Sequence, residues 1–243
     1  MKFIKLFEEQ TAFDEAKSTL NRPNVSLIKT NRKVYSLTEE GGVNANGYSY
    51  VDLGLPSGLK WAKCNVGAKK ETDYGYYFMW GSTTPNTADE CTWTNAPFNN
   101  RSSNFNSVYF NDHKSEWLDS KNNLKSEFDA ARAIMKGDWR IPTKAEIQEL
   151  IDNTTNKWFA NYNDTDVSGT KFTSKKNGNS IFIPAAGYCS SGSVYNADNI
   201  SYVWSSSINT SDSALAWNFN GDLVSADAIS DPRSNGLAVR GVL

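Results

Sequence analysis

Four residue types are missing from the C-terminal part of this 243-residue chain. The last 67 residues, Asn177–Leu243, contain no lysine, glutamate, glutamine or methionine, whereas the first 176 residues contain 34 of them. At the frequency of the first part, about 13 would be expected in the last 67. Serine, asparagine, aspartate, alanine, glycine and tyrosine take their place. Because short polar side chains and tyrosine are typical of adaptable recognition surfaces, this composition predicts a region that binds.

An excess of basic residues is also missing. Lysine and arginine number 25 against 27 aspartates and glutamates, and no basic stripe is visible, so nucleic acid is not an expected partner. No apolar run approaches the length of a transmembrane helix, and we expect no membrane insertion. The segment MKFIKLFEEQTAF has no apolar run of signal-peptide length. We therefore expect synthesis in the cytoplasm, with any extracellular role reached within a particle or through lysis.

Histidine and cysteine are too scarce for most catalytic or metal centres. The three cysteines, Cys64, Cys91 and Cys189, form no CxxC motif, which predicts reduced, buried thiols and leaves a single disulfide as an alternative. His113 is the sole histidine and lies in the polar segment YFNDHKSEW, which we expect to be an exposed loop. The segment NYNDTD at 161–166 is read as a turn, with a bound cation as the alternative. No catalytic residue, cofactor or metal is predicted.

The pattern of apolar residues predicts two units in an α+β fold. Residues 1–45 read as a small β-α-β-β unit, with a strand at Lys2–Phe7, a helix capped by Thr11 and a hairpin at Val25–Leu37. Such a unit is too small for a robust core, so we expect it to assemble with other copies or attach to other proteins. Glycines and asparagines at 41–47 indicate a linker. Residues 46–243 form the main domain.

The main domain reads as many short strands with two helices. The first helix is predicted at Glu127–Met135, and the second begins after Thr143, where Glu146 completes a capping box. We expect only strands after the second helix. The asparagine-rich stretch Thr83–Lys125 is predicted to form long surface loops, with Trp93 partly exposed. The same partial exposure is expected for Trp117.

Three segments carry a family resemblance. VDLGLPSGLKWAKCNVGA at 51–68, DYGYYFMWG at 73–81 and DWRIPTKAEIQEL at 138–150 resemble the Fibrobacter/Bacteroidetes major paralogous domain, a C-type-lectin-fold family of gut bacterial surface proteins. The ending VWSSS…AWNF…SNGLAVRGV at 203–242 resembles the closing strands of that family. The resemblance implies a C-type lectin fold with two helices and short mixed sheets. It also implies that Trp61, Trp80 and Trp139 are core residues and that Arg240 supports the fold by bonding carbonyls or an acid.

The same scaffold is used by variable proteins of diversity-generating retroelements, including phage tropism determinants, which this chain also resembles. Adenine-directed mutation of AAC codons in those systems gives NNC codons, which cannot encode Lys, Glu, Gln, Met or Trp. Four of these five residues are the types missing from the C-terminal region. The fifth occurs as Trp204 and Trp217, which would then be fixed framework positions. The diversified region is expected at about 187–236. A weaker interpretation of the composition is that strand-rich regions are often poor in lysine and glutamate.

Two related activities fit the sequence less well. Calcium-dependent lectins carry an EPN or QPD triplet and a Trp-Asn-Asp strand, but this chain has Trp217-Asn218-Phe219. Formylglycine-generating oxidases share the WRIPT-like segment but need paired cysteines late in the chain for copper. Here Cys189 stands alone in the late sequence, so oxidase activity is the third alternative.

The candidate binding surface lies in the last strands and loops. In the stretch Ala214–Asn220, alternation is expected to turn Leu215, Trp217 and Phe219 inward and Asn218 and Asn220 outward. Loops at 191–202, 209–213 and 221–234 supply the other contacts. The full set of candidates is Tyr195, Asn199, Tyr202, Asn209, Ser211, Asp212, Ser213, Asn218, Asn220, Asp222, Ser225, Asp227, Ser230 and Asp231.

The expected function is non-enzymatic binding of a bacterial surface protein or glycan receptor by a phage or prophage tail-tip protein. The N-terminal unit would attach it to other virion proteins, and a homotrimer would add multivalency. The protein would then reside in the virion tail, or in the cytoplasm before assembly. The alternative is a cell-surface adhesion or carbohydrate-binding domain of a Bacteroidetes protein, which should carry a lipoprotein signal.

Overall fold

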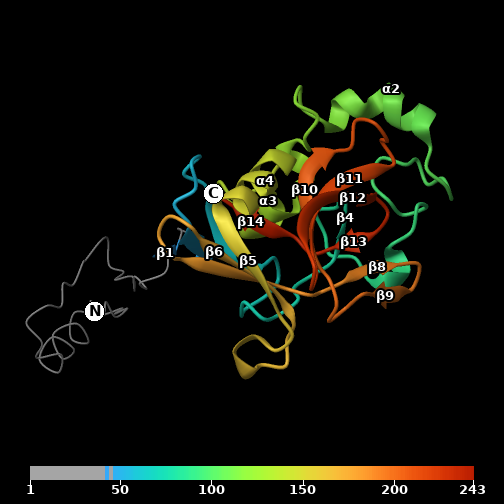
Figure 1. Ribbon diagram of the computed structural model, residues 1–243. Coiled ribbons are helices and arrows are strands. Elements are labelled where there is room, and N and C mark those ends of the chain that lie inside the picture. Colours follow the sequence, from blue (N-terminus) through green and yellow to red (C-terminus); the bar gives the residue numbers. More distant parts are fainter. Residues whose placement is uncertain (1–41, 44–45) are drawn as a thin grey trace, which may run out of the picture.

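A computed structural model describes residues 42–43 and 46–243 and has an α+β architecture in which short strands outnumber helices (Figure 1). The strand, helix and hairpin expected within residues 1–45 lie outside the described residues. Part of the expected linker is ordered, because Gly42–Val43 forms strand β1 and pairs with Ser49 and Tyr50.

Four sheets make up the β part of the fold. The first has the strand order β1-β2-β3-β14, with β2 at Ser49–Asp52, β3 at Lys60–Asn65 and β14 at Arg240–Val242. The second has the order β5-β6-β7, at Thr154–Phe159, Gly169–Ser174 and Ser180–Pro184.

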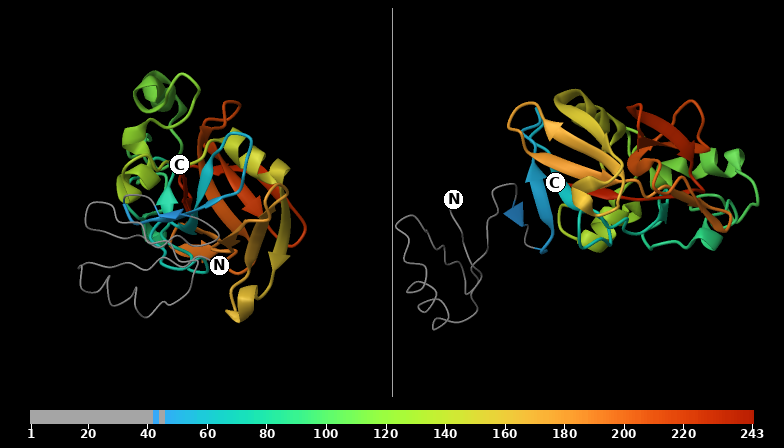
Figure 2. Two further views of the ribbon diagram at one scale, coloured as in Figure 1. Left: turned by 90° about the vertical axis from the view of Figure 1, so that its left-hand side faces the viewer. Right: turned by 60° about the horizontal axis from the view of Figure 1, so that its bottom comes forward.

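The other two sheets lie toward the opposite end of the molecule from the C-terminus (Figure 2). The sheet β10-β11-β12 consists of Ser201–Ile208, Leu215–Gly221 and Ala226–Pro232. The sheet β4-β13-β8-β9 consists of Phe78–Met79, Gly236–Leu237, Tyr188–Ser190 and Ser193–Tyr195.

The expectation of mixed sheets is wrong for the described residues. Every strand pair within the four sheets is antiparallel, and the parallel contact is an isolated bridge between Val203 and Ala238. Most neighbouring strands are joined by short turns, and such turns allow only antiparallel pairing.

The described residues contain three α-helices, one more than the sequence predicts. Helix α2 spans Ser107–Trp117, α3 spans Ala130–Met135 and α4 spans Lys144–Asn153. Short 3₁₀ turns occur at Ala88–Glu90 (η1), Ser126–Phe128 (η2) and Tyr162–Asp164 (η3).

The helix boundaries follow from capping residues. The Thr143 side chain accepts a hydrogen bond from the Glu146 amide while Glu146 bonds back to the Thr143 amide, so the predicted capping box of α4 is confirmed. The helix expected at Glu127–Met135 is interrupted, because the Asp129 side chain caps α3 and leaves η2 as a separate turn. Helix α2 replaces part of the loops expected at Thr83–Lys125, and Asn106 caps it.

Two large apolar clusters flank the β10-β11-β12 sheet. One cluster contains Ile147 and Leu150 of α4 together with Val203 and Phe219. The other contains Trp204 and Ala216 with residues of α2, α3 and β4. The central sheet is thus covered on both faces, which makes it a rigid support for the residues at its margins.

Most of the expected tryptophan positions agree with the structure. Trp61, Trp80 and Trp139 are buried in the core, as expected. Trp117 was expected to be partly exposed, but it is buried because α2 folds it against Phe98. Trp93 is half-buried. Among the described residues, no helix has the length and apolar character needed to span a membrane.

Candidate functional site

The register of the β10-β11-β12 sheet places its candidate residues on two faces. Tyr202 pairs with Asn220, which pairs with Asp227, so these three residues lie in one row across the sheet. Ala216 pairs with Asp231, and because side chains alternate along a strand, Asp231 lies on the same face. The opposite face carries Val203, Phe219 and Ala228 against helix α4.

The expected inward and outward faces of strand β11 were partly wrong. Asn218 was expected at the surface but is 0% exposed, as is Ala216. Trp217 was expected in the core but is only half-buried, and Lys144 Nζ lies 3.1 Å from the centroid of its ring. Asn218 is buried because its face of the sheet packs into the core with Trp204 and Ala216, whereas Trp217 on the other face is covered only in part, by Lys144 at the start of α4.

Trp204 is the stronger framework residue of the two C-terminal tryptophans. Its side chain is 1% exposed, and its indole Nε1 donates to the carbonyl oxygen of Phe78 at 2.7 Å. This hydrogen bond joins β10 to β4, so a change at Trp204 would disturb two sheets.

Three tyrosines extend the polar face of this sheet toward the β8–β9 hairpin. The Tyr188 and Tyr195 rings stack at 5.4 Å between centroids, and Tyr188 meets Tyr202 edge to face at 5.6 Å. Asn196 Nδ2 donates to the Tyr202 hydroxyl at 3.4 Å. Burial raises the pKa of Tyr202, and the side chains of Asn196 and Asn220 partly offset this rise.

A buried amide and a carboxylate continue this face. Asn218 Nδ2 donates to Asp231 Oδ2 at 2.9 Å, while Asn218 Oδ1 is buried and has no hydrogen-bond partner in the described part of the chain. Burial raises the pKa of the half-buried Asp231 carboxyl, and the hydrogen bond from Asn218 opposes this rise. Asn218 is fully buried and supports the face from below, whereas the half-buried Asp231 carboxylate is partly exposed on it.

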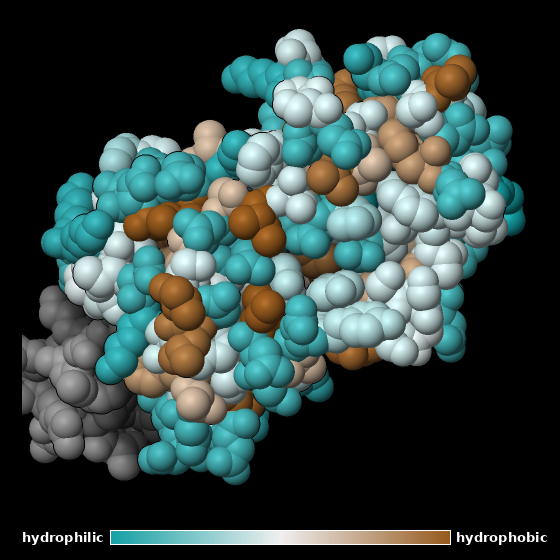
Figure 3. Space-filling model, turned by 45° about the vertical axis from the view of Figure 1, so that its right-hand side comes forward, coloured by the Kyte–Doolittle hydropathy of each residue, from teal (hydrophilic) through white to brown (hydrophobic). Residues whose placement is uncertain are grey.

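We call this surface the tyrosine–amide face and define it by its residues. It consists of Tyr188, Tyr195, Asn196, Tyr202, Asn218, Asn220, Asp227 and Asp231. On the side of the molecule drawn in Figure 3, hydrophobic side chains lie in separate small groups among polar and weakly polar ones. The tyrosine–amide face offers tyrosine rings, amides and carboxylates, which are groups typical of adaptable recognition surfaces.

Six of the fourteen sequence candidates belong to this face, and eight do not. The loop expected at 221–234 is instead a short turn followed by strand β12, which the sequence does not predict. Of the eight, Asn209, Ser211, Asp212 and Ser213 lie in the β10–β11 turn, and Asp222 and Ser225 lie at the opposite end of the sheet in the β11–β12 turn. Asn199 precedes β10.

Ser230 lies on the other face of the sheet and accepts a hydrogen bond from Asn209 Nδ2 at 3.1 Å. Tyr202, expected in a loop, lies in strand β10 and is only 6% exposed. Sequence reasoning missed Tyr188 and Asn196. Their place in the tyrosine- and asparagine-rich stretch 188–202 was the available signal, but their pairing partners are set by the hairpin.

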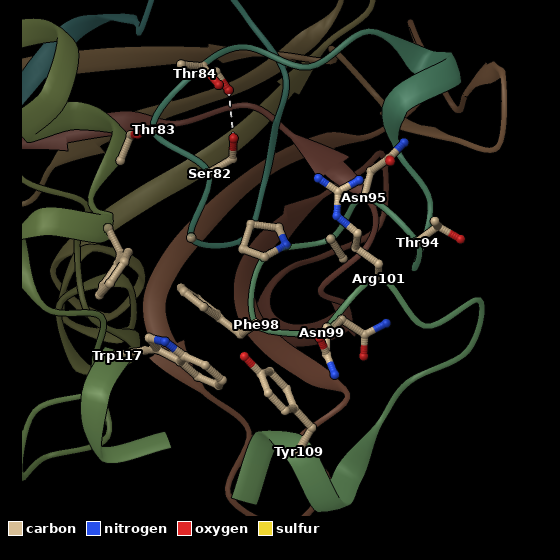
Figure 4. Close-up of a pocket in the computed structure, with 15 residues that line it drawn as sticks. Ser82, Thr83, Thr84, Thr94, Asn95, Phe98, Asn99, Arg101, Tyr109 and Trp117 are labelled. Atoms are coloured by element: carbon tan, nitrogen blue, oxygen red, sulfur yellow. Dashed lines mark hydrogen bonds between the residues drawn. The ribbon is translucent and has the colours of Figure 1, made fainter. Parts of the chain in front are cut away.

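A separate hollow lies beside helix α2 (Figure 4). Its volume is about 680 Å³, within the range of small-molecule sites. Four aromatic residues line its interior: Phe98, Tyr109, Trp117 and Phe128. Hydroxyl and amide side chains surround the opening, with Arg101 among them: Thr83, Thr84, Thr94, Asn95, Asn100 and Arg101. We call it the α2 hollow.

The loop that walls the α2 hollow is held in an unusual conformation. Phe98, Asn100 and Arg101 all have positive φ angles, of 64°, 48° and 55°. Such angles are uncommon for residues other than glycine, and each costs roughly 1–3 kcal/mol. Asn99 compensates, because its buried amide donates to the carbonyls of Trp93, Ser102 and Asn104 and accepts from the Asn106 amide. Strain retained in this way is typical of functional sites.

Arg233 lies beneath the same loop without an acidic partner. Its Nε donates to the Ser213 carbonyl at 2.8 Å and Nη1 to the Pro97 carbonyl at 3.4 Å, while Nη2 has no partner in the described part of the chain. The guanidinium lies 4.3 Å from the Phe110 ring centroid. Burial lowers the pKa of Arg233 to about 9, so the group remains charged near neutral pH. Aromatic rings provide part of the stabilisation that an acid would give.

Cys189 stands alone in the late sequence, but the fold brings a second thiol to it from an earlier segment. Cys91 lies beside Cys189, and both are buried and reduced. An added Cβ on Gly236 would approach both sulfur atoms, at 2.3 Å from Cys189 and 2.6 Å from Cys91. Cys91 Sγ also contacts the Thr87 carbonyl oxygen at 3.2 Å. The adjacent Cys189 thiol and burial raise the pKa of Cys91, whereas the hydrogen bond with Cys91 lowers the pKa of Cys189, so the pair does not hold two thiolates together.

His113 is not in the exposed loop that the sequence predicts. It lies on α2, is half-buried, and its Nδ1 is 2.8 Å from the Tyr109 carbonyl oxygen. Its ring also stacks on Trp117. The ring therefore packs between the Tyr109 and Trp117 side chains of the same helix.

The segment at 161–166 forms η3 and an adjoining turn, in which Asn163, Asp164 and Asp166 have positive φ angles. In the described ranges, no group of three or more His, Cys, Asp or Glu side chains is placed to hold a metal ion. The site chemistry therefore rests on tyrosine, amide, hydroxyl and a few charged groups.

The chain was compared with protein-family models, curated proteins and solved structures, and none of the three comparisons returned a match.

Proposed function

We propose that this protein is a non-enzymatic binding protein with a C-type lectin fold, which recognises a bacterial surface protein or glycan through the tyrosine–amide face. It belongs, in this proposal, to a phage or prophage tail tip and varies by a diversity-generating retroelement. The observation that carries the proposal is the gathering of Asn220, Asp227 and Asp231 on one face of the β10-β11-β12 sheet, with Tyr195 of the neighbouring β8–β9 hairpin beside them through Tyr188 and Tyr202.

The lectin-fold part of the proposal is supported by how the chain closes. Strand β3 lies between β2 and β14, so the two ends of the described domain meet in one sheet. The segment DWRIPTKAEIQEL contributes buried Trp139 and the capped helix α4. The resemblance that the sequence carries in these segments therefore involves residues with structural roles.

The division between fixed and variable positions is supported by burial. Trp204 and Asn218 are fully buried and bonded to other strands or side chains, whereas Tyr195 and Asp227 are exposed. A fixed support with changeable polar side chains limits the entropy cost of binding. Tyrosine adds a large contact area with few rotatable bonds.

Sequencing the encoding gene and its neighbourhood tests the retroelement. We expect codons ending in C at Tyr195, Asn220, Asp227 and Asp231, and a nearby near-repeat that differs from the gene mainly at adenines. A neighbouring reverse transcriptase and tail genes would add support. Codons of all endings with no near-repeat would contradict diversification without contradicting binding by the face.

Binding to cells tests the face itself. Fluorescently labelled full-length protein is added to a panel of gut Bacteroidetes strains, and the strains that retain it are identified. Asn220→Ala and Asp227→Ala should reduce retention about tenfold or more, as expected when central contacts are lost. The matched control is Asn156→Ala, at an exposed position of β5 in another sheet. Equal losses in the control, or unchanged retention in the two face variants, would contradict the proposal.

The oxidase, the third alternative, gains one supporting observation, because Cys91 places a thiol beside Cys189. The test is a titration of the reduced protein with Cu(I), the metal that soft thiolate ligands favour. Tight one-to-one binding that Cys91→Ser abolishes would support the oxidase. Weak Cu(I) binding that is unchanged in Cys91→Ser would contradict the oxidase and favour the non-enzymatic binding function.

The proposed assembly is a homotrimer attached to other virion proteins through residues 1–45. Light scattering of the full chain should give three times the 27.0 kDa chain mass. A monomer at high concentration would contradict the trimer. A surface-protein operon around the gene, instead of tail genes, would favour the adhesion-domain alternative.

A further inference from the structure

We propose that the α2 hollow is a second binding site, which takes an acidic oligosaccharide. This inference goes beyond the proposed function, because the hollow is built from a different part of the chain than the tyrosine–amide face. Binding at either surface can therefore fail without affecting the other.

The interior of the hollow offers apolar ring surfaces with a polar tip. Phe98 and Trp117 stack at 4.6 Å between centroids, and Phe128 meets Phe98 edge to face at 5.1 Å. Tyr109 lies against Trp117 and points its hydroxyl toward Phe98 and Trp117 in Figure 4. A ligand whose rings have apolar faces and hydroxyl groups at their edges, such as a sugar, suits this lining better than a purely apolar or purely ionic ligand does.

The opening is rich in groups that both donate and accept hydrogen bonds. Thr83, Thr94 and Asn100 side chains make no hydrogen bond within the described part of the chain. Hydroxyl and amide groups match the mixed donor and acceptor pattern of sugar hydroxyls. The hollow is also large enough for more than one sugar ring, at about 680 Å³.

Arg101 sets the charge of the ligand. It is the one charged residue among the described residues that line the hollow, and no acidic side chain there pairs with it. In Figure 4 its guanidinium extends over the hollow beside Asn95. A guanidinium binds a carboxylate in a bidentate geometry, so an acidic sugar satisfies both the charge and the hydroxyl-rich rim.

The wall that carries Arg101 is ordered before any ligand binds. Asn99 makes four hydrogen bonds to the loop backbone, and Phe98 is fixed between Trp80, Trp117 and Phe128. A wall that is already ordered lowers the entropy cost of binding a ligand. The hydrogen bonds of Asn99 also hold Phe98, Asn100 and Arg101 at their positive φ angles.

Calorimetric titration of the full-length protein tests the site with named probes. The acidic probes are trigalacturonate and sialyllactose, and the matched neutral probe is the trimethyl ester of trigalacturonate. We expect at least one acidic probe to bind with a dissociation constant of about 1 mM or tighter. If trigalacturonate binds, its trimethyl ester should bind about tenfold more weakly than the free acid. If sialyllactose binds, lactose, which lacks the acidic sugar, should bind about tenfold more weakly than sialyllactose.

Four variants locate the binding. Arg101→Gln should weaken the acidic probe about tenfold, and Tyr109→Phe should weaken acidic and neutral probes alike. Lys114→Gln is the control, because it removes a cation from an exposed position of helix α2 outside the lining. Asn220→Ala of the tyrosine–amide face should have no effect.

The proposal is overturned if neither acidic probe binds at about 10 mM. It is also overturned if Arg101→Gln and Lys114→Gln have equal effects, or if inorganic phosphate alone binds as tightly as the oligosaccharides. Circular dichroism of each variant checks that the fold is retained.

Discussion

Two buried arginines in the C-terminal region differ in how their guanidinium groups are satisfied. Arg240 donates to Asn65 Oδ1 and to the carbonyls of Ala62, Lys63 and Phe182, so the predicted supporting role is confirmed. Burial lowers the pKa of Arg240 to about 10. Arg233 has fewer hydrogen bonds and lies among aromatic rings instead. Both therefore stay charged at neutral pH without a carboxylate partner.

Asp231 should make stability depend on pH in an unusual direction. Burial raises the pKa of its carboxyl in the folded protein above the unfolded value. The folded state then binds the proton more tightly, so this contribution to stability is present below the unfolded pKa and is lost as pH rises through the folded pKa. Asp231→Asn should therefore increase the free energy of unfolding more at pH 7 than at pH 4.

Chemical denaturation of the unmodified protein and of Asp231→Asn at pH 4 and pH 7 measures this change in the free energy of unfolding. Asp227→Asn is the control, since it removes a carboxylate from an exposed position of the same strand. An equal pH dependence in the two variants would show that burial at Asp231 has no such effect.

Gly81 controls the position of Phe98 in the α2 hollow. A Cβ at Gly81 would lie 2.3 Å from the Phe98 ring, and the backbone φ there is +87°. Gly81→Ala should therefore lower the free energy of unfolding by about 2–4 kcal/mol, from backbone strain and displacement of the ring. Urea denaturation gives the value.

Gly58→Ala separates these two causes. Gly58 has a φ of +76°, but a Cβ there has no atom within 4 Å. Its substitution should cost only the backbone part, about 1 kcal/mol. If the two glycine variants lose the same stability, the contact with Phe98 contributes nothing.

At the scale of elements, the capped helix was the easiest feature to predict and the polar elements were the hardest. Helix α4 has a capping box and apolar Ile147 and Leu150 on one face, so its sequence carries both signals. Helix α2 buries Phe110 and Trp117 with polar residues between them, a pattern that also fits a loop. Strand β12 lacks large apolar residues apart from Ile229, so pairing with β11 decides its conformation.

The capping box of α4 should be measurable as stability. Thr143→Ala removes the side-chain acceptor for the Glu146 amide and should lower the free energy of unfolding by about 1 kcal/mol. The adjacent ion pair between Arg140 and Glu146, at 2.5 Å, should survive the change. Thr155→Ala at an exposed position of β5 is the control, and denaturation midpoints compare the two. A loss at Thr143 no larger than in the control would contradict the capping role.

At the scale of the whole molecule, strand β14 closes the fold by joining distant parts of the chain. Leu243 and Lys60 exchange backbone hydrogen bonds of 2.9 and 3.0 Å at the end of the first sheet. Arg240 extends this closure to the second sheet, because its Nη2 donates to the Phe182 carbonyl in β7. One side chain therefore ties β14 to both β3 and β7.

Arg240→Leu should destabilise the whole domain rather than one strand. It would leave three carbonyl oxygens and the Asn65 amide oxygen without their donor, and we expect a loss of about 3 kcal/mol or more. The readout is the midpoint of thermal unfolding, followed both by tryptophan fluorescence and by far-UV circular dichroism. Loss of fluorescence signal before the circular dichroism signal would indicate local rather than global unfolding.

Arg132→Leu serves as the control for this change. Arg132 is half-buried and donates to the Gly137 carbonyl through Nη1, so its removal affects one loop. We expect a smaller shift in the midpoint than for Arg240. Comparable shifts would contradict the role of Arg240 in joining two sheets.

The sequence by itself determined the α+β class, the capped helix α4, the core tryptophans and the composition of the C-terminal region, because these depend on local patterns and residue types. Only the tertiary structure decided that Asn218 is buried, that Tyr188 and Asn196 join the tyrosine–amide face, and that Cys91 meets Cys189. These outcomes depend on which strands pair and which faces are covered. Such contacts join residues far apart in the chain, and local periodicity contains no information about them.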